Sequence, residues 1–329
     1  MASQLHRDAV VVDGLQICDW GRPIFAQFRE AGLTAVNCTC AVWEGFAATL
    51  ANIAGWQRHF EEHADLLRPV RTVADIEAAK REGRTGVVLG FQNSWPVEDR
   101  LERLGLFHEL GVRVIQLTYN TQNLVGSGCW ESRDGGLSDY GRDVLAEMNR
   151  LGIVADLSHV GPQTCHDVVE ASTRPVVYSH VCPAARNPHL RNKTDEQLRH
   201  LAGRGGLVGI TLLPWFLRAD GRATIEDYLD AIEHVIDVVG EEQVAIGTDF
   251  MQGHGLGFLE WLRRDKGTGR LLTRLPSPGE PYVAAPEGLL EIRDLPRLTE
   301  AMERRGWSEE RILRVLGRNW LRLFADVWL

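Results

Sequence analysis

Eight short apolar runs of strand length recur along the 329-residue chain, and longer segments with helical periodicity separate them. Most of these runs are continuous in apolar residues rather than alternating, which is typical of strands that are covered on both faces. Strands that alternate with helices favour a parallel sheet. The predicted strands are Val10–Leu15, Ala35–Cys40, Gly86–Gln92, Val114–Asn120, Ile153–His159, Pro175–His180, Leu207–Leu213 and Val244–Phe250.

The segments between the runs carry recognisable helix boundaries. Candidate N-terminal caps precede three of them, and a glycine closes two, as helix-capping chemistry leads us to expect. These boundaries are Thr72-x-x-Asp75 closed by Gly83, Ser138 closed by Gly152, and Thr194-x-x-Gln197.

Two α/β architectures use such units, a closed (β/α)8 barrel and an open doubly wound sheet. The open sheet usually has a Gly-rich phosphate turn after its first strand, and the segment Asp13-Gly14-Leu15-Gln16 does not supply one. We therefore predict a (β/α)8 TIM barrel formed by residues 1–329 as a single domain. Residues 256–289 are expected to form an irregular excursion, and residues 294–326 extra C-terminal helices that pack against the barrel wall.

Composition restricts the functional classes. The net charge of −9 argues against nucleic-acid binding, and no apolar run approaches the roughly 18 to 20 residues of a membrane-spanning helix. The N-terminus lacks the layout of a signal peptide, so we expect a cytoplasmic protein without membrane contact. The six scattered cysteines favour buried free thiols, with metal ligation at Cys38-x-Cys40 as the weaker alternative.

Polar residues end several predicted strands, at the rim where barrels carry their functional groups. Two consecutive runs finish in Ser-His, so His159 and His180 are expected to reach the same rim, where imidazoles can bind a metal. Asp249 ends a later run, and its carboxylate must pair or bind a cation to offset desolvation. The ordinary alternatives are core histidines with satisfied partners and an aspartate that caps the next loop.

Other polar residues complete the candidate site. Arg191 follows the His180 strand in a loop, where its fork of donors could hold a substrate carboxylate or simply face solvent. Gln92, Tyr119 and Asn120 end two further predicted strands and would face the same rim.

Several motifs, in order along nearly the whole chain, resemble the renal or membrane dipeptidase family of zinc metallopeptidases. The resemblance implies a metallo-dependent hydrolase-like (β/α)8 barrel, commonly dimeric, whose two-zinc site hydrolyses dipeptides and tolerates a D residue at the C-terminal position. The motifs are Gly136-Leu137-Ser138, Met148-Asn149-Arg150-Leu151-Gly152, Asp156-Leu157-Ser158-His159-Val160, Ser179-His180, Arg191-Asn192-Lys193-Thr194-Asp195 and Ile246-Gly247-Thr248-Asp249-Phe250.

The resemblance implies a role for each matching residue. His159 and His180 correspond to the histidines of the second metal position. Asp249 corresponds to the aspartate that contacts the first metal and handles the proton or the substrate amine. Arg191 corresponds to the arginine near the substrate carboxylate.

The chain departs from the family pattern at four positions. Leu15 and Ile17 stand where the family has the His-x-Asp ligands of the first zinc, and neither side chain can bind a metal. Gln92 replaces the bridging glutamate, and a neutral amide is a much poorer ligand. Tyr119 replaces the histidine that meets the scissile carbonyl.

Counting the remaining ligands predicts zero or one zinc ion. One hypothesis is a divergent hydrolase that cleaves the amide bond of a dipeptide or related amino-acid derivative. In it His159, His180 and Asp249 hold the metal, Asp249 and Tyr119 are catalytic, and Arg191, Gln92 and Asn120 bind substrate. The alternative is a metal-free barrel that binds or transforms a small carboxylate or amine metabolite. A purely structural partner is a weaker third reading, because polar strand ends would lower its stability.

Overall fold

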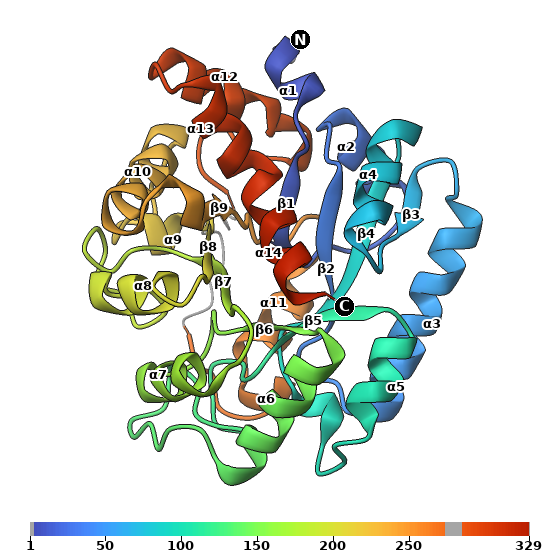
Figure 1. The fold of residues 1–329 in the computed structure, drawn as a ribbon, viewed down its shortest axis with the longest axis vertical. Coiled ribbons are helices and arrows are strands. Elements are labelled where there is room, and N and C mark those ends of the chain that lie inside the picture. The colour runs from blue at the N-terminus through green and yellow to red at the C-terminus, as the bar shows by residue number, and fades with distance from the viewer. Residues whose placement is uncertain (1–2, 274–284, 329) are drawn as a thin grey trace.

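The computed structural model describes residues 3–273 and 285–328, which form a parallel sheet rolled into a barrel (Figure 1). The strands follow the order β1-β2-β4-β5-β6-β7-β8-β9 around the ring. A parallel bridge between Gln16 and Phe250 closes the ring from β9 to β1, helped by a 2.9 Å hydrogen bond from the Asp249 amide to the Leu15 carbonyl. The predicted (β/α)8 barrel is confirmed.

Each predicted run contains a strand, but most strands are shorter than predicted. β6 ends at Asp156 and β9 at Ile246, so His159 and Asp249 lie in the loops that follow, whereas His180 lies within β7. The short β3, which pairs with the edge of β4, was not predicted. The strands are β1 (Val12–Gln16), β2 (Ala35–Ala41), β3 (Leu67–Pro69), β4 (Thr85–Phe91), β5 (Val112–Gln116), β6 (Val154–Asp156), β7 (Val177–Val181), β8 (Leu207–Ile210) and β9 (Val244–Ile246).

Helices cover the outside of the barrel, and their predicted boundaries are confirmed. Thr72 and Thr194 form capping boxes with the third residue of their helices, and Ser138 accepts a hydrogen bond from the Gly141 amide. The helices are α1 (Gln4–Asp8), α2 (Arg22–Glu30), α3 (Phe46–Glu62), α4 (Val73–Glu82), α5 (Arg103–Glu109), α6 (Asp139–Leu151), α7 (Pro162–Ala171), α8 (Asp195–Ala202), α9 (Pro214–Leu217), α10 (Ile225–Val239), α11 (Leu256–Arg263), α12 (Pro296–Arg304), α13 (Glu309–Leu313) and α14 (Asn319–Val327).

The C-terminal helix α14 lies across one end of the barrel, not along its wall as predicted (Figure 1). Its apolar face packs on a ring of buried residues, one from each barrel strand, such as Val12 of β1 and Val177 of β7. Trp320 donates from Nε1 to the Ile246 carbonyl at 2.9 Å. The C-terminal aromatic residues are therefore core residues that close the barrel at the amino ends of its strands.

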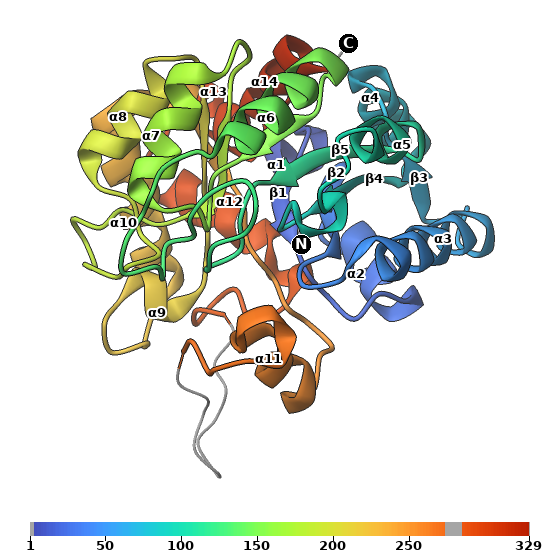
Figure 2. The same cartoon turned by 90° about the horizontal axis from the view of Figure 1, so that it is seen from below.

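The opposite end of the barrel carries α11 (Figure 2). This helix and a following single turn (Asp265–Gly267) belong to the predicted excursion, of which residues 274–284 lie outside the described residues. Trp43 Nε1 donates to the Leu262 carbonyl of α11 at 3.3 Å, and Thr121 Oγ1 donates to Asp265 Oδ1 at 2.9 Å. These bonds hold α11 against the loops that follow β2 and β5, over the carboxyl ends of the strands.

All six cysteines are buried and free, which confirms that reading of their pattern. Within the ranges 3–273 and 285–328, no helix combines the length and the apolar character that crossing a membrane requires.

Candidate metal and substrate site

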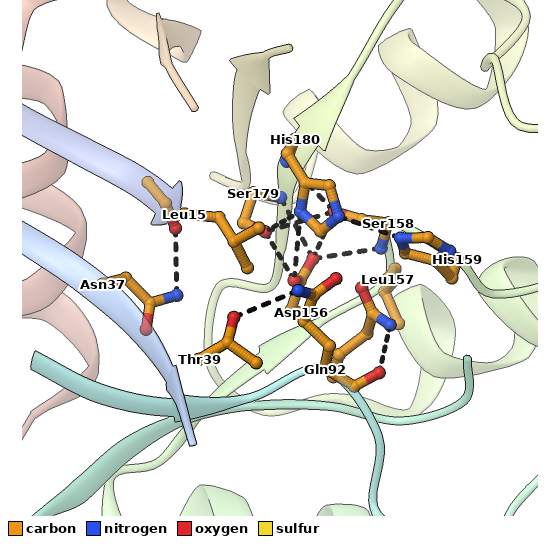
Figure 3. Close-up of polar contacts among 12 residues, drawn as sticks. Leu15, Asn37, Thr39, Gln92, Asp156, Leu157, Ser158, His159, Ser179 and His180 are labelled. Carbon is orange, nitrogen blue, oxygen red and sulfur yellow. Dashed lines mark hydrogen bonds and ion pairs between the residues drawn. The ribbon is translucent and has the colours of Figure 1, made fainter. Parts of the chain in front are cut away.

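Two imidazoles meet at the carboxyl end of the barrel. His159, in the loop after β6, and His180, in β7, approach with their Nε2 atoms 3.0 Å apart (Figure 3). The His180 side chain is fully buried, and His159 is 6% exposed. The prediction that these two strands deliver both histidines to one place is confirmed.

Asp156 organises the His180 side of this pair. Its carboxylate accepts hydrogen bonds from the amide and hydroxyl of Ser158 and from the amide and hydroxyl of Ser179, at 2.5 to 3.0 Å. Because the Ser179 hydroxyl donates to Asp156, its oxygen accepts from His180 Nδ1 at 2.6 Å. An acidic group that orients an imidazole through its second nitrogen is a common arrangement behind a metal ligand.

Asn120 has the corresponding role for His159. Its Oδ1 atom lies 2.7 Å from His159 Nδ1 and can only accept, so this nitrogen carries a proton. The backbone of Asn120 is held in the left-handed region, with φ of 59°, where few non-glycine residues occur. Asn120 therefore positions the imidazole, whereas its predicted contact with substrate stays a prediction.

These partners leave both Nε2 atoms as acceptors when the two rings are neutral. Burial, followed by the nearby positive charge of Arg191, holds the pKa of each histidine well below its usual value, so the rings do not readily share an extra proton. Two facing lone pairs 3.0 Å apart fit a single cation held between the rings. The residues present thus suit one metal position.

Asp249 contributes a buried carboxylate with unused acceptors. It is 6% exposed, its φ is 60°, and no residue in the described part of the chain donates a hydrogen bond to its side chain. Burial raises the pKa of this carboxyl to about 7, although Arg191 opposes the shift. The ligand atoms of Asp249 and the two histidines do not all lie within 4.8 Å of one another. Its assignment as a third ligand therefore stays a prediction.

Arg191 is buried rather than exposed in its loop. Its guanidinium donates to the backbone carbonyls of Ser158 and His180, the second at 2.8 Å, which ties together the ends of β6 and β7. Its Nε atom is buried and has no partner among the described residues. Lys193 lies close by, also buried, and donates to the Val160 carbonyl at 2.8 Å. Two buried cations make this side of the site favourable for an anion.

The half of the site that would bind a first metal does not fit one. Figure 3 shows Leu15 of β1 directed toward the histidines, and its side chain is buried. Ile17 belongs to an apolar cluster that also contains Trp43, Tyr119 and Leu262 of α11. The apolar side chains of Leu15 and Ile17 therefore stand where a first metal would need ligands.

Gln92 and Tyr119 border the histidine pair. Gln92, at the end of β4, donates from Nε2 to Thr39 Oγ1 at 3.0 Å. The Tyr119 ring stacks on His159 with a centroid distance of 4.1 Å. Burial and the nearby Asp249 raise the pKa of the Tyr119 hydroxyl, so it remains a proton donor at neutral pH.

Sequence reasoning missed the residues that orient the histidines. Asp156, Ser158 and Ser179 form one buried network, and they belong to the two segments that end in Ser-His. The available signal was an aspartate within an apolar run, because a buried carboxylate requires several donors.

A closed barrel with paired imidazoles at the carboxyl ends of its strands carries polar groups where (β/α)8 enzymes have their active sites. The chain belongs to the membrane dipeptidase family (peptidase family M19), whose sequence model matches residues 24–268 and 279–328.

Curated relatives of similar sequence agree with this membership. Dipeptidase tcpJ of Claviceps purpurea is 30% identical over 274 residues, which cover 82% of this chain and 58% of that protein. Dipeptidase aclJ of Aspergillus oryzae is 31% identical over 277 residues, again 82% of this chain and 58% of the relative. The chain thus spans less than two thirds of the length of these two relatives.

Solved structures show the same fold. An amidohydrolase from Pseudomonas aeruginosa is 48% identical and superposes with a TM-score of 0.96, covering 99% of this chain and 98% of that one. A metallopeptidase from Rhodobacter sphaeroides, solved with a phosphinate mimic of L-Ala-D-Ala, is 23% identical with a TM-score of 0.80, covering 98% of this chain and all of that one. At this lower identity the likeness concerns the fold alone.

Proposed function

We propose that this protein hydrolyses the amide bond of a dipeptide or a related small amino-acid derivative, with at most one metal ion held by His159 and His180. The observation that carries the proposal is the pair of Nε2 atoms 3.0 Å apart. The Nδ1 atom of each ring is already hydrogen-bonded, to Asn120 in His159 and to Ser179 in His180. Family membership and the dipeptidase names of the curated relatives support the reaction class. The amidohydrolase name of the 48% identical protein is consistent with it.

The metal position would be mononuclear. A zinc ion there would supply Lewis acidity, which polarises a carbonyl and makes water easier to deprotonate. His159 and His180 would hold it, with Asp249 or Gln92 as the remaining candidates for a third ligand. Leu15 and Ile17 leave too few ligands for a second ion.

The protein's own groups would move the proton and stabilise charge. A carboxyl group whose pKa lies near 7 suits Asp249 to accept a proton from water and return it to the leaving amine. The Tyr119 hydroxyl would donate to the oxygen that becomes negative as the amide carbonyl is attacked. Since Tyr119 stacks on His159, this donor lies beside the proposed metal position.

Substrate would be held by groups around the histidine pair. The Nε of Arg191, which lacks a partner in the described residues, is suited to a substrate carboxylate. Gln92 and Asn120 supply amide groups beside the scissile bond. We further propose that residues 1–329 form one domain that associates as a homodimer, which light scattering on the purified protein would test.

A second candidate function is metal-free binding or transformation of a small carboxylate or amine metabolite. The specific observation in its favour is the packing of Ile17 in the apolar cluster with Tyr119 and Leu262, where a metal ligand would otherwise stand. In this candidate the buried cations Arg191 and Lys193 would hold the carboxylate.

Metal analysis followed by assay separates the two candidates. Purified protein is supplied with zinc, its metal content is measured, and it is assayed on dipeptides and N-acyl amino acids, with a chelated sample beside it. The hydrolase proposal expects up to one equivalent of metal at His159 and His180 and chelator-sensitive release of amino acid. Protein that binds no metal at these two histidines and turns over nothing, yet melts at higher temperature with a metabolite, would support the second candidate instead.

A further inference from the structure

A second group of metal-ligating side chains lies on the outer helix α3. His59, Glu62 and His63 are spaced three and four residues apart, so they project from one face at the end of the helix. One ligand atom from each lies within 4.8 Å of the other two, and no other histidine, cysteine or acidic group of three meets this criterion in the described residues.

The two imidazoles are held in place and lack partners. The Nδ1 atoms of His59 and His63 are buried and make no hydrogen bond within residues 3–273 and 285–328. The two imidazole rings stack with their centroids 5.8 Å apart. The ring of the buried Phe25 of α2 packs against both, with centroid distances of 5.2 Å to His59 and 5.3 Å to His63. Because a buried nitrogen without a partner costs free energy, a bound ligand at these two nitrogens would offset that cost.

We propose that His59, Glu62 and His63 form a binding site for a divalent transition-metal ion, of which zinc is the best match. Two imidazoles and one carboxylate are ligands that zinc accepts, and histidines four residues apart on a helix can reach one ion together. Three protein ligands leave one position for water or for a group from another molecule.

The position of the site in the barrel makes it independent of the proposed reaction. His59 and His63 pack on Phe25 of the outer helix α2, whereas His159 lies in the loop after β6. α3 lies on the outside of the barrel beside β3 and β4 (Figure 1). The ion would fix the last turn of α3 and stabilise the fold through binding, without touching substrate.

A comparable cluster between α7 and α8 provides a matched control. His200 and His166 also stack, at 4.8 Å, but His200 Nε2 already bonds to Glu170 at 2.7 Å. Arg204 bonds to the same carboxylate at 2.5 Å. A carboxylate neutralised in this way is a poor metal ligand, so we expect no binding at His200.

The test is calorimetric titration of the metal-stripped full chain with zinc. We expect one binding event that His63→Gln and Glu62→Gln both abolish and that His200→Gln leaves unchanged. Any equivalent bound at His159 and His180 should persist in the first two variants, and so should hydrolysis. In addition, zinc should raise the melting temperature of the wild type more than that of Glu62→Gln.

The outcomes are distinguishable from those of the proposed function. If the histidine pair in the barrel holds no metal, a single event remains, and it should still vanish in Glu62→Gln. Glu62 is exposed, so its replacement by glutamine keeps the test valid even if His63→Gln fails to fold. Equal stoichiometry and affinity in the wild type and in Glu62→Gln would overturn the proposal.

Discussion

His159 and His180 face each other through Nε2 atoms 3.0 Å apart, while Asn120 and Ser179 engage their Nδ1 atoms. Each ring is oriented through the nitrogen that points away from the other ring. The pair is thereby fixed in the form in which both lone pairs can bind one cation. The residues that orient the two imidazoles would thus not contact the ion themselves.

Removing the Ser179 hydroxyl should weaken metal binding without removing a ligand. Ser179→Ala breaks the link between Asp156 and His180 Nδ1, so the ring loses its fixed orientation. We expect zinc affinity at this position to fall about 10- to 100-fold, as measured by competition with a chromophoric chelator. Ser172→Ala, which removes a hydroxyl near the surface, is the control. Unchanged affinity in Ser179→Ala would show that the network does not support a ligand.

Asp249 should make the stability of the metal-free protein fall as the pH rises. The folded carboxyl keeps its proton up to a pKa of about 7, whereas an unfolded aspartate loses it near pH 4. Between these values the unfolded chain binds fewer protons, so the free energy of unfolding decreases from about pH 4 to about pH 7. Asp249→Asn removes this dependence.

The variant should therefore be more stable than the wild type at pH 8, and the difference should shrink toward pH 4. Urea unfolding of both proteins in the presence of chelator, at several pH values, measures this difference in the free energy of unfolding. The same variant should lose hydrolysis, because the amide cannot accept the proton. If Asp249→Asn were less stable than the wild type at pH 8, the Asp249 carboxylate would have a stabilising partner in the folded protein, contrary to this prediction.

Gln92→Glu should strengthen metal binding at the histidine pair. The substitution adds an anionic oxygen ligand at nearly constant volume, at the end of β4 beside the histidines. In the metal-free protein the new buried charge should lower stability, because the Thr39 hydroxyl, which now accepts from Gln92, would have to turn and donate to it. Opposite changes in zinc affinity and in metal-free melting temperature are thus expected. Weaker zinc binding in Gln92→Glu would place this side chain away from the metal.

The fold was predictable because the local signals agree with one another. The capping residues Thr72, Ser138 and Thr194 start helices where the pattern placed them, and the continuous apolar runs became barrel strands. The three-residue β3 escaped prediction because its second residue is partly exposed, its third is exposed, and the strand carries no distinctive pattern.

The candidate site was only partly predictable. The histidine pair followed from two neighbouring strands that end alike, but the contacts of Arg191 with two backbone carbonyls depend on the three-dimensional path of its loop. The closing position of α14 likewise depends on tertiary packing. An amphipathic stripe shows that a helix is buried on one face, and it does not show against which part of the barrel.

Three glycines make room for the Ser179 carbonyl at the centre of the barrel. A Cβ atom at Gly209 or at Gly247 would overlap this oxygen, and one at Gly14 would also meet Trp320. Gly247→Ala should therefore push β7 outward, lowering the free energy of unfolding by about 1 to 3 kcal/mol. Because Ser179 and His180 move with that strand, zinc affinity should fall as well.

The matched control for this substitution is Gly105→Ala in α5, where an added Cβ meets nothing within 4 Å. Alanine there should stabilise the helix by up to about 1 kcal/mol and leave zinc binding unchanged. Urea unfolding and zinc titration of both variants provide the comparison. If Gly247→Ala were as stable as Gly105→Ala, the strands around Ser179 would not need the close contact that glycine at position 247 permits. The histidine pair would then owe its spacing to its hydrogen bonds alone.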